Sequence, residues 1–175
     1  MLDLVVFGVN TGCRQGGVIN LRWNQIDLAK GRVILDSRAY MTKSKRVRMI
    51  PLNRAAIELL RRRKEAASTE FVFTLEGKAI DPNRMNKLFK ASVIKAKLNP
   101  HFHFHNLRHT FASWLVMGGV SLYQVQRLLG YSTATVTQIY AHLTNAKIVV
   151  SNTCVSIGGD LRYLDVLYNS WVVAV

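Results

Sequence analysis

Three short helical patterns follow one another between residues 106 and 143, and they constrain the fold of this chain more than any other feature. The first is ended by Gly118-Gly119, because glycine readily adopts the left-handed turn that stops a helix. The second opens at Ser121, where a glutamine three residues later completes a capping-box pattern, and it stops at Gly130. The third begins near Ser132 and again spaces its apolar residues at a helical period. This half of the chain is therefore predicted to be helical.

The first half is predicted to hold helices on both sides of one small sheet. The segment GRVILDS, opened by Gly31, and the segment ending in VRMIPL have strand composition, and a polar turn at about 42–45 joins them into an antiparallel hairpin. The fold class that follows is mainly α with a small antiparallel β-sheet (α+β). Helices in this half are predicted at about 2–9 and 16–21, from the cap Asn53, and from Asp81-Pro82.

Positive charge dominates the chain, which has a formal net charge of +14 and a pI of about 10.3. The charge is uneven, because the only charged residues after Val150 are Asp160, Arg162 and Asp165. Such an excess points to a polyanionic partner, most simply nucleic acid, with a merely basic soluble protein as the alternative. The basic run at 61–64 is expected to be the solvated end of a helix, where cations suit the helix dipole.

The cysteines indicate the redox compartment of the protein, and the start of the chain indicates whether it is a fragment. Cys13 and Cys154 are too few for a disulfide framework or a zinc site, so we expect a reducing compartment. No apolar run approaches the roughly 20 residues of a membrane span, and the N-terminus lacks the basic start of a signal peptide. Because the chain starts inside a predicted helix, we expect it to be a fragment of a longer protein.

Two arginines and a histidine are candidates for holding a phosphate. Arg14 lies beside glycines in TGCRQGG, where a ligand can approach the backbone closely; the alternative is an arginine that binds turn carbonyls. His105 and Arg108 share a face at the start of a helix, whose free N–H groups favour an anion. Arg108 also neighbours apolar positions, so we expect it to be half buried and to need a partner, for which a phosphate is the simplest choice.

Two further candidates compete with strong structural alternatives. Lys43 is predicted at the hairpin tip, where it can reach a scissile phosphate or be part of a solvated basic turn. Tyr140 lies on an apolar helical face, where a tyrosine is ordinarily part of the core.

The histidine run offers a metal site as the competing interpretation. His101, His103 and His105 alternate, as ligands on a strand would, but no nearby cysteine or aspartate completes a set. Ligands at this spacing on one short strand rarely close around one ion, so we expect no metal. His109 is expected simply to pack.

Four segments, in this order, resemble the tyrosine recombinase (phage integrase) family: TGCRQGGVINLRWNQID, TKSKRVRMIPL, HNLRHTFASWL and LLGYSTATVTQIYAHL. The resemblance runs from about residue 2 to residue 145 and implies a catalytic domain, helical with a small sheet, at 1–146. The tail at 147–175 has no clear period and does not resemble the helix that follows the nucleophile in the family. The upstream DNA-clamping domain usual in the family has no counterpart in this chain.

The resemblance implies a site-specific recombinase or integrase that cuts and rejoins DNA strands through a 3′-phosphotyrosyl intermediate, without a metal or nucleotide cofactor. It implies duplex DNA as the partner, a homo-multimer (a tetramer) in a synaptic complex, no membrane, and a cytoplasmic, nucleoid-associated location for a bacterial or phage-encoded protein. The alternative is a catalytically impaired DNA-binding remnant or regulator of the same family. A metal-dependent nuclease that uses the histidine run is a third, weaker possibility.

Carried over by position, the phosphate-binding residues are Arg14 and Arg108, with His105 completing the H-x-x-R pair. Two arginines suit a phosphodiester under attack, because they can hold its non-bridging oxygens bidentately. The family usually has an acid at the position of Gly17, so Arg14 is expected to be less firmly held here. It usually has histidine or tryptophan at the position of Tyr131, whose hydroxyl can still donate one hydrogen bond.

The same resemblance makes Tyr140 the nucleophile and Lys43 the acid that protonates the leaving 5′ oxygen. Because tyrosine has an ordinary pKa of about 10, either the cationic cluster must favour its phenolate or a base such as His105 must take its proton. The remaining basic residues of the hairpin are expected to contact DNA: Lys45, Arg46 and Arg48.

Overall fold

The computed structural model describes residues 1–36, 47–131 and 135–143. The helices in these ranges are α1 (Leu2–Thr11), α2 (Gln15–Ile19), η1 (Trp23–Gln25, a 3-10 helix), α3 (Arg54–Glu65), α4 (Pro82–Lys95), α5 (Phe104–Met117), α6 (Leu122–Leu129) and α7 (Thr135–Gln138). The strands are β1 (Ile26–Asp27), β2 (Arg32–Asp36), β3 (Val47–Pro51), β4 (Thr74–Leu75) and β5 (Lys78–Ala79). The predicted class, mainly α with a small antiparallel sheet, is confirmed.

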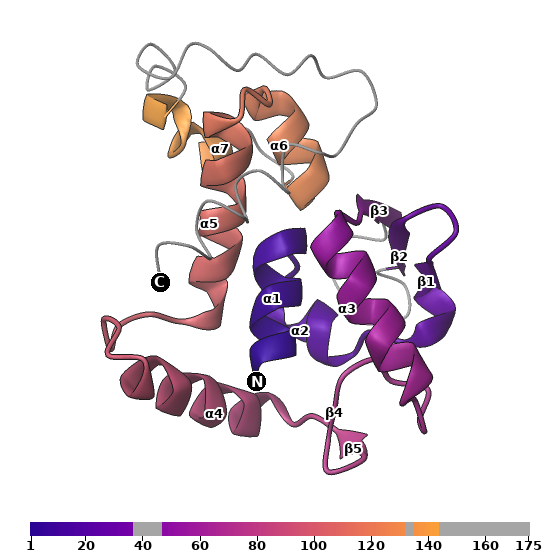
Figure 1. The fold of residues 1–175 in the computed structure, drawn as a ribbon. Coiled ribbons are helices and arrows are strands. Elements are labelled where there is room, and N and C mark those ends of the chain that lie inside the picture. Colours follow the sequence, from indigo (N-terminus) through magenta and orange to yellow (C-terminus); the bar gives the residue numbers. More distant parts are fainter. Residues whose placement is uncertain (37–46, 132–134, 144–175) are drawn as a thin grey trace.

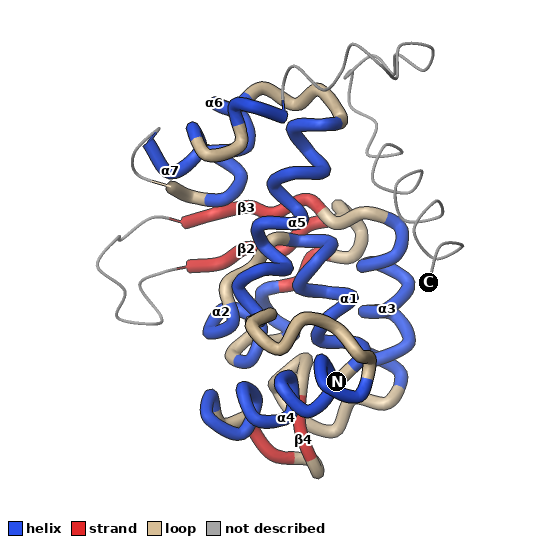
Figure 2. The backbone as a smooth tube through the Cα atoms, turned by 90° about the vertical axis from the view of Figure 1, so that its left-hand side faces the viewer, coloured by secondary structure: helices blue, strands red, loops and turns tan. Residues whose placement is uncertain are grey.

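Helix α1 lies at the centre and packs against α3 and α5 (Figure 1). Helix α4 runs across the lower end of the molecule, while α6 and α7 gather at the upper end of α5 (Figure 1). Turned by 90°, the molecule shows β2 and β3 at mid-height, between α6 and α7 above and α4 below (Figure 2). The sheet therefore lies beside the point where the lower and upper parts of the molecule meet.

The main sheet has three antiparallel strands in the order β1-β2-β3, with Val33 opposite Ile50 and Leu35 opposite Arg48. Alternate residues of a strand face opposite sides. Ile50 is buried while Met49 is 60% exposed, so Arg48 lies on the same, inward side as Ile50. This register directs one of the basic hairpin residues toward the protein interior.

Two apolar clusters build the core, and α5 runs through both. The larger cluster joins α1, α2, β2, β3, α3 and α4, and it takes Phe104 and Leu107 from the first half of α5. The smaller cluster joins α6 and Tyr140 to Phe111 and Leu115 from the second half. One residue of α5, Arg108, falls between these two sets of apolar side chains.

Most predicted helix boundaries are confirmed because local caps fix them. Asn53 accepts a hydrogen bond from the Ala56 amide at the start of α3, and Asp81 accepts from two amides at the start of α4. The Ser121 hydroxyl accepts a hydrogen bond from the backbone amide of Gln124, and the side-chain oxygen of Gln124 accepts one from the backbone amide of Ser121. These reciprocal bonds complete the predicted capping box.

Several predictions about the ends of the chain's elements were wrong. Helix α5 begins at Phe104, two residues earlier than expected, and α7 spans only Thr135–Gln138. Ile139 continues the apolar spacing of this helical pattern in the sequence but is 52% exposed. The short hairpin of β4 and β5 was not predicted from the sequence, since a two-residue strand carries too little pattern to detect.

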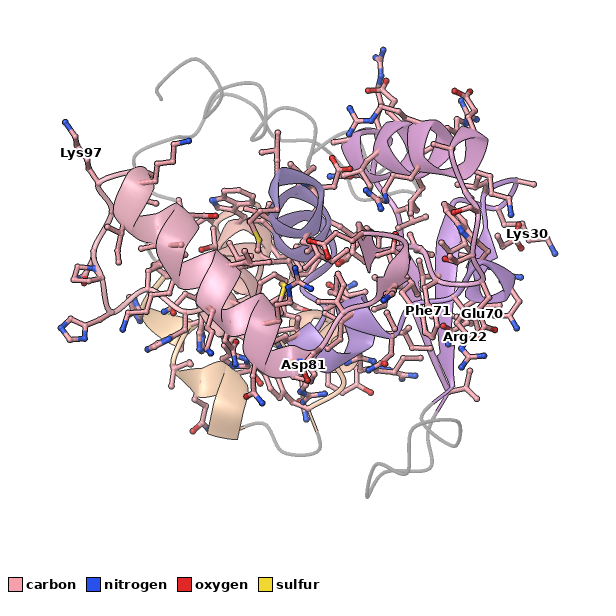
Figure 3. The ribbon with its side chains drawn as sticks, turned by 90° about the horizontal axis from the view of Figure 1, so that it is seen from below. Arg22, Lys30, Glu70, Phe71, Asp81 and Lys97 are labelled. Atoms are coloured by element: carbon pink, nitrogen blue, oxygen red, sulfur yellow. The ribbon has the colours of Figure 1, made fainter. Side chains whose placement is uncertain are left out.

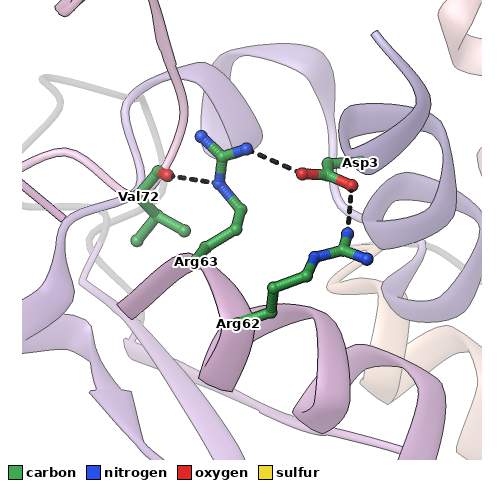
Figure 4. A network of polar contacts seen from close by, with 4 residues as sticks. All are labelled: Asp3, Arg62, Arg63 and Val72. Carbon is green, nitrogen blue, oxygen red and sulfur yellow. Dashed lines mark hydrogen bonds and ion pairs between the residues drawn. The ribbon is translucent and has the colours of Figure 1, made fainter. Parts of the chain in front are cut away.

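The basic end of α3 is exposed at Arg61, Arg62 and Lys64, as the sequence suggested, but two of its arginines also make structural contacts. Asp3 receives hydrogen bonds from Arg62 and Arg63, at 2.6 Å and 2.7 Å, and Arg63 also donates to the Val72 carbonyl (Figure 4). These contacts tie α3 to α1 and to the segment before β4, so part of the positive charge is used structurally.

A second polar contact joins the segment before η1 to the segment before β4. Arg22 forms an ion pair with Glu70 at 2.7 Å and lies over the Phe71 ring, 5.0 Å from its centroid (Figure 3). Figure 3 also shows Asp81 and Lys97 at opposite ends of α4. None of the helices in the described ranges combines the length and apolar character needed to cross a bilayer.

Candidate functional site

Arg108 is the residue on which the site is built. Its side chain is only 1% exposed, and it donates from Nη1 to the Gly12 carbonyl at 2.6 Å, from Nη2 to the Leu129 carbonyl at 2.5 Å, and from Nε to the Tyr131 hydroxyl at 3.2 Å. The expectation that Arg108 is half buried and short of partners was therefore wrong, because backbone carbonyls serve as those partners.

Both carbonyls belong to helix ends, which explains why a cation is stable there. Leu129 ends α6 and Gly12 follows α1, and the last carbonyls of a helix lack intrahelical partners and carry partial negative charge. One planar guanidinium can reach two such groups at once. Arg108 thereby holds the C-terminal ends of α1 and α6 together.

Glycines make this approach possible. Gly12 has φ 61 and Gly130 has φ 67, the left-handed conformation that ends each helix. A Cβ at Gly12 would collide with the Phe111 ring and come within 2.9 Å of a Leu129 methyl group. A Cβ at Gly130 would collide with the side chain of Arg48.

Two further arginines gather around Arg108. Arg48, projecting inward from β3, donates through Nη1 to the same Leu129 carbonyl. Arg14 occupies the N-cap position of α2 without a side-chain capping bond, is partly exposed, and lies 5.9 Å from the centroid of the Tyr131 ring. Burial lowers the pKa of Arg14 and of Arg48, and the positive charge of Arg108 lowers both further.

No acid neutralises this cluster among the residues that the structure describes. The ion pairs there involve other arginines, at positions 22, 32, 54, 62, 63 and 84. Three guanidinium groups without a carboxylate create a positive potential that favours an anion. Arg14, which is exposed and has no carboxylate partner in these ranges, is the member of the cluster best placed to meet it.

Tyr131 joins the arginines to the remaining side chains of the site. The Arg108 guanidinium lies over its ring, 4.6 Å from the centroid, and the Tyr131 hydroxyl accepts the bond from Arg108 Nε. An arginine over an aromatic face is stabilised by the ring's negative face. Since its oxygen accepts from Arg108, the Tyr131 hydroxyl keeps its own hydrogen to donate elsewhere.

Tyr140 is buried, at 4% exposed, and its hydroxyl is 2.5 Å from Nδ1 of His109. Burial raises the pKa of Tyr140 to about 12; Tyr131 adds to this rise, and the positive charge of Arg108 opposes it. The expectation that His109 only packs was therefore wrong. The signal available in the sequence was the four-residue step from His105, which puts both imidazoles on one face of α5.

His105 is exposed at the start of α5, and its ring meets the His109 ring edge to face with centroids 5.0 Å apart. Burial lowers the pKa of His105, and the charges of His109, Arg108 and Arg14 lower it further. His105 lies next to His109 rather than next to Tyr140.

The other predicted residues fall into three groups. Lys43, Lys45 and Arg46 lie outside the described residues. Arg48, expected to contact DNA, has its guanidinium on a backbone carbonyl of α6. The alternation of His101, His103 and His105 is not that of a strand, since the last of these is already helical, and the described ranges hold no group of three metal-ligating side chains.

Comparison with known proteins identifies relatives of the whole described region. A model of the phage integrase family matches residues 2–147. Tyrosine recombinase XerC of Proteus mirabilis is 34% identical over 146 residues, which cover 79% of this chain and 45% of that protein. The integrase of Salmonella phage P22 is 30% identical over 153 residues, which cover 81% of this chain and 38% of that protein. The chain spans less than half the length of these two relatives.

Solved structures share the fold. The crystal structure of XerA recombinase superposes with a TM-score of 0.70 at 22% identity, over 83% of this chain and 54% of that one. The catalytic domain of bacteriophage HP1 integrase gives a TM-score of 0.60 at 24% identity, over 83% of this chain and 76% of that one. The family model covers most of the chain, at residues 2–147, and this match shows that the chain belongs to the phage integrase family.

Proposed function

We propose that this chain is the catalytic domain of a site-specific DNA recombinase or integrase, which cuts and rejoins DNA strands through a 3′-phosphotyrosyl intermediate. The observation that carries the proposal is the convergence of Arg14, Arg108, Tyr131 and Tyr140, from separate elements, on one cationic site without a carboxylate partner in the described ranges. A tyrosine beside arginines fits attack on a phosphodiester better than any other chemistry available to these groups.

In this reaction Arg14 and Arg108 hold the non-bridging oxygens of the scissile phosphate. The Tyr140 oxygen attacks phosphorus, the bond to the 5′ oxygen breaks, and Lys43 protonates that oxygen as it leaves. Tyr131 donates a further hydrogen bond to the phosphate. Removing one such preorganised donor typically costs roughly 10²–10³ in rate.

The burial of Arg108 and Tyr140 sets a requirement on this mechanism. At 1% and 4% exposed, neither side chain can touch a phosphate while the described arrangement is closed. Arg14 is exposed and can meet the DNA backbone first. Engagement of the DNA is then expected to open the contacts around Tyr131 before the nucleophile reaches phosphorus.

Duplex DNA is the proposed partner, and a homo-tetramer in a synaptic complex the proposed assembly. The strong positive charge supports DNA binding, because neutralising phosphates releases counterions. Structures with this fold include a transposon integrase in complex with a circular intermediate DNA and XerH recombinase bound to a palindromic substrate. A bacterial or phage-encoded protein of the cytoplasm, associated with the nucleoid, agrees with these partners.

Covalent trapping tests the proposal. Duplexes with a randomised core and a nick beside the candidate cut positions are incubated with the chain, so that the short fragment with the freed 5′ hydroxyl diffuses away after cleavage and the intermediate accumulates. We expect a denaturation-resistant protein–DNA adduct from the wild type and none from Tyr140→Phe. An adduct that survives Tyr140→Phe at full yield would exclude Tyr140 as the nucleophile, and no adduct from the wild type would refute recombinase activity of this chain.

A second function is a DNA-binding regulator that has lost catalysis. Gly17 favours it, because the acid usual at this position in the family is replaced by a residue without a side chain. Salt-sensitive duplex binding without any covalent adduct, in the wild type and in Lys43→Ala alike, would identify this alternative.

A further inference from the structure

The contact between His109 and Tyr140 has no role in the proposed mechanism so far. The Tyr140 hydroxyl is 2.5 Å from the imidazole Nδ1, and the two ring centroids are 6.0 Å apart. His105, which the family resemblance associates with the reaction, instead contacts the His109 ring edge to face. The imidazole in direct reach of the nucleophilic oxygen is therefore that of His109.

The chemistry of the pair is complementary. A phenol O–H can donate to an imidazole nitrogen that carries no hydrogen, and this requires the histidine proton to be on Nε2. Tyr131 accepts from Arg108 and lies beside Tyr140, so the Tyr140 oxygen is held between a hydroxyl and an imidazole. The titratable groups that contact His109 are His105 and Tyr140; Arg108 and Arg14 act on His105, and Arg108 and Tyr131 act on Tyr140.

We propose that His109 is the proton acceptor for Tyr140 during strand cleavage. This inference rests on the proposed recombinase function. The phenol O–H bond breaks and its proton moves to Nδ1, while the oxygen lone pair forms the bond to phosphorus. The bond from phosphorus to the 5′ oxygen breaks, and that oxygen takes its proton from the acid assigned to Lys43. In rejoining, His109 returns the proton to the phenol as Tyr140 leaves.

Two substitutions separate proton transfer from positioning. In His109→Asn the amide lies near the place of Nδ1, so its oxygen can still accept the phenol hydrogen bond, but an amide is not a base. In His109→Leu both the hydrogen bond and the base are lost. His101→Asn is the matched control, since the side chain of His101 is exposed and lies outside the site.

The first experiment does not depend on DNA. The full chain is labelled with 3-fluorotyrosine, the Tyr140 signal is assigned by its loss in Tyr140→Phe, and its fluorine shift is followed against pH. Protonation of the His109 ring would break its bond with the Tyr140 hydroxyl, so we expect a step in this signal with pH in the wild type, in His101→Asn and in His105→Asn, and its loss in His109→Asn. A step that persists in His109→Asn would overturn the proposed coupling.

The second experiment measures adduct formation on the nicked duplexes. Loss of a general base typically lowers the rate by roughly 10²–10⁴, so we expect such a loss in His109→Asn and in His109→Leu, and none in His101→Asn. Replacing Tyr140 by a more acidic fluorinated tyrosine should recover part of the rate in His109→Asn. Wild-type rates in His109→Asn would show that positioning alone suffices and would overturn the proposal. No adduct from any variant would refute the recombinase function instead, while the fluorine titration would still decide whether His109 and Tyr140 are coupled.

Discussion

Replacing Arg108 by lysine tests whether this arginine holds the two parts of the molecule together. The guanidinium reaches the carbonyls of Gly12 and Leu129 and the hydroxyl of Tyr131 at the same time. A lysine ammonium is a single point on a flexible stem and cannot span all three. Arg108→Lys keeps the charge and most of the side-chain volume, so the loss of the fork is the main change.

The expected magnitude follows from these bonds. A hydrogen bond to a charged group contributes about 1.5–3 kcal/mol, and leaving a buried carbonyl without its donor costs about 1–3 kcal/mol. The Leu129 carbonyl keeps its donor from Arg48, but the Gly12 carbonyl is orphaned if the ammonium stays at Leu129, and we expect a loss of about 3 kcal/mol in the free energy of unfolding. Such a loss is a large part of the roughly 5–15 kcal/mol that stabilises a domain and lowers Tm by about 10 °C.

Urea unfolding followed by circular dichroism measures this difference, with Arg61→Lys as the control. Arg61 is exposed on α3, so its replacement should change the free energy of unfolding by less than about 0.5 kcal/mol. If Arg108→Lys is as stable as that control, Arg108 does not tie the ends of α1 and α6 together. The result also matters for activity, because a loss of adduct in an Arg108 variant supports phosphate binding by Arg108 only where the variant is folded.

Three further predictions concern Tyr140, Gly130 and Gly17. Burial raises the pKa of Tyr140 to about 12, from about 10 in the unfolded chain, so its contribution to stability is complete below pH ~10 and is lost as the pH rises to about 12. In urea unfolding, the wild type should lose about 2–3 kcal/mol of unfolding free energy relative to Tyr140→Phe across this window. Parallel pH profiles of the two proteins would contradict this. Gly130→Ala should destabilise the protein by about 1–3 kcal/mol, because φ is 67 there and a Cβ meets Arg48, and an unchanged Tm would argue against the strain. Gly17→Glu should be tolerated, since a Cβ there would lie 3.7 Å from a Leu35 methyl group, and it should stabilise α2 by about 0.5–1 kcal/mol. An increase in adduct yield in this variant would show that the missing acid limits Arg14, whereas a fall would reject that role.

The fold was largely predictable where neighbouring residues decide it. Asn53, Asp81 and the Ser121 capping box each satisfy amides within three residues, so their effect is visible in the sequence. The short hairpin of β4 and β5 and the early end of α7 escaped prediction. Each involves too few residues for a period to be detected.

The candidate site was predicted as a set of residue types but not as a set of contacts. Arg108 was expected to be half buried beside apolar positions, yet it is fully buried and its partners are backbone carbonyls, which no sequence pattern distinguishes. Arg48 was assigned to DNA from the basic hairpin, while the strand register turns its side chain inward. His109 was assigned to packing because the position of Tyr140 relative to α5 was unknown.

The sequence by itself determined where the capped helices begin, the strand pairing of the hairpin and the family, because caps, periodicity and ordered motifs act over short stretches of chain. Only the tertiary structure decided which side chains and carbonyls contact one another in the site. The deciding bonds join residues 96 apart in the pair of Arg108 and Gly12, 81 apart in that of Arg48 and Leu129, and 31 apart in that of His109 and Tyr140. Contacts over such separations depend on how α1, β3, α5 and α6 pack together, and that packing is a property of the whole folded chain.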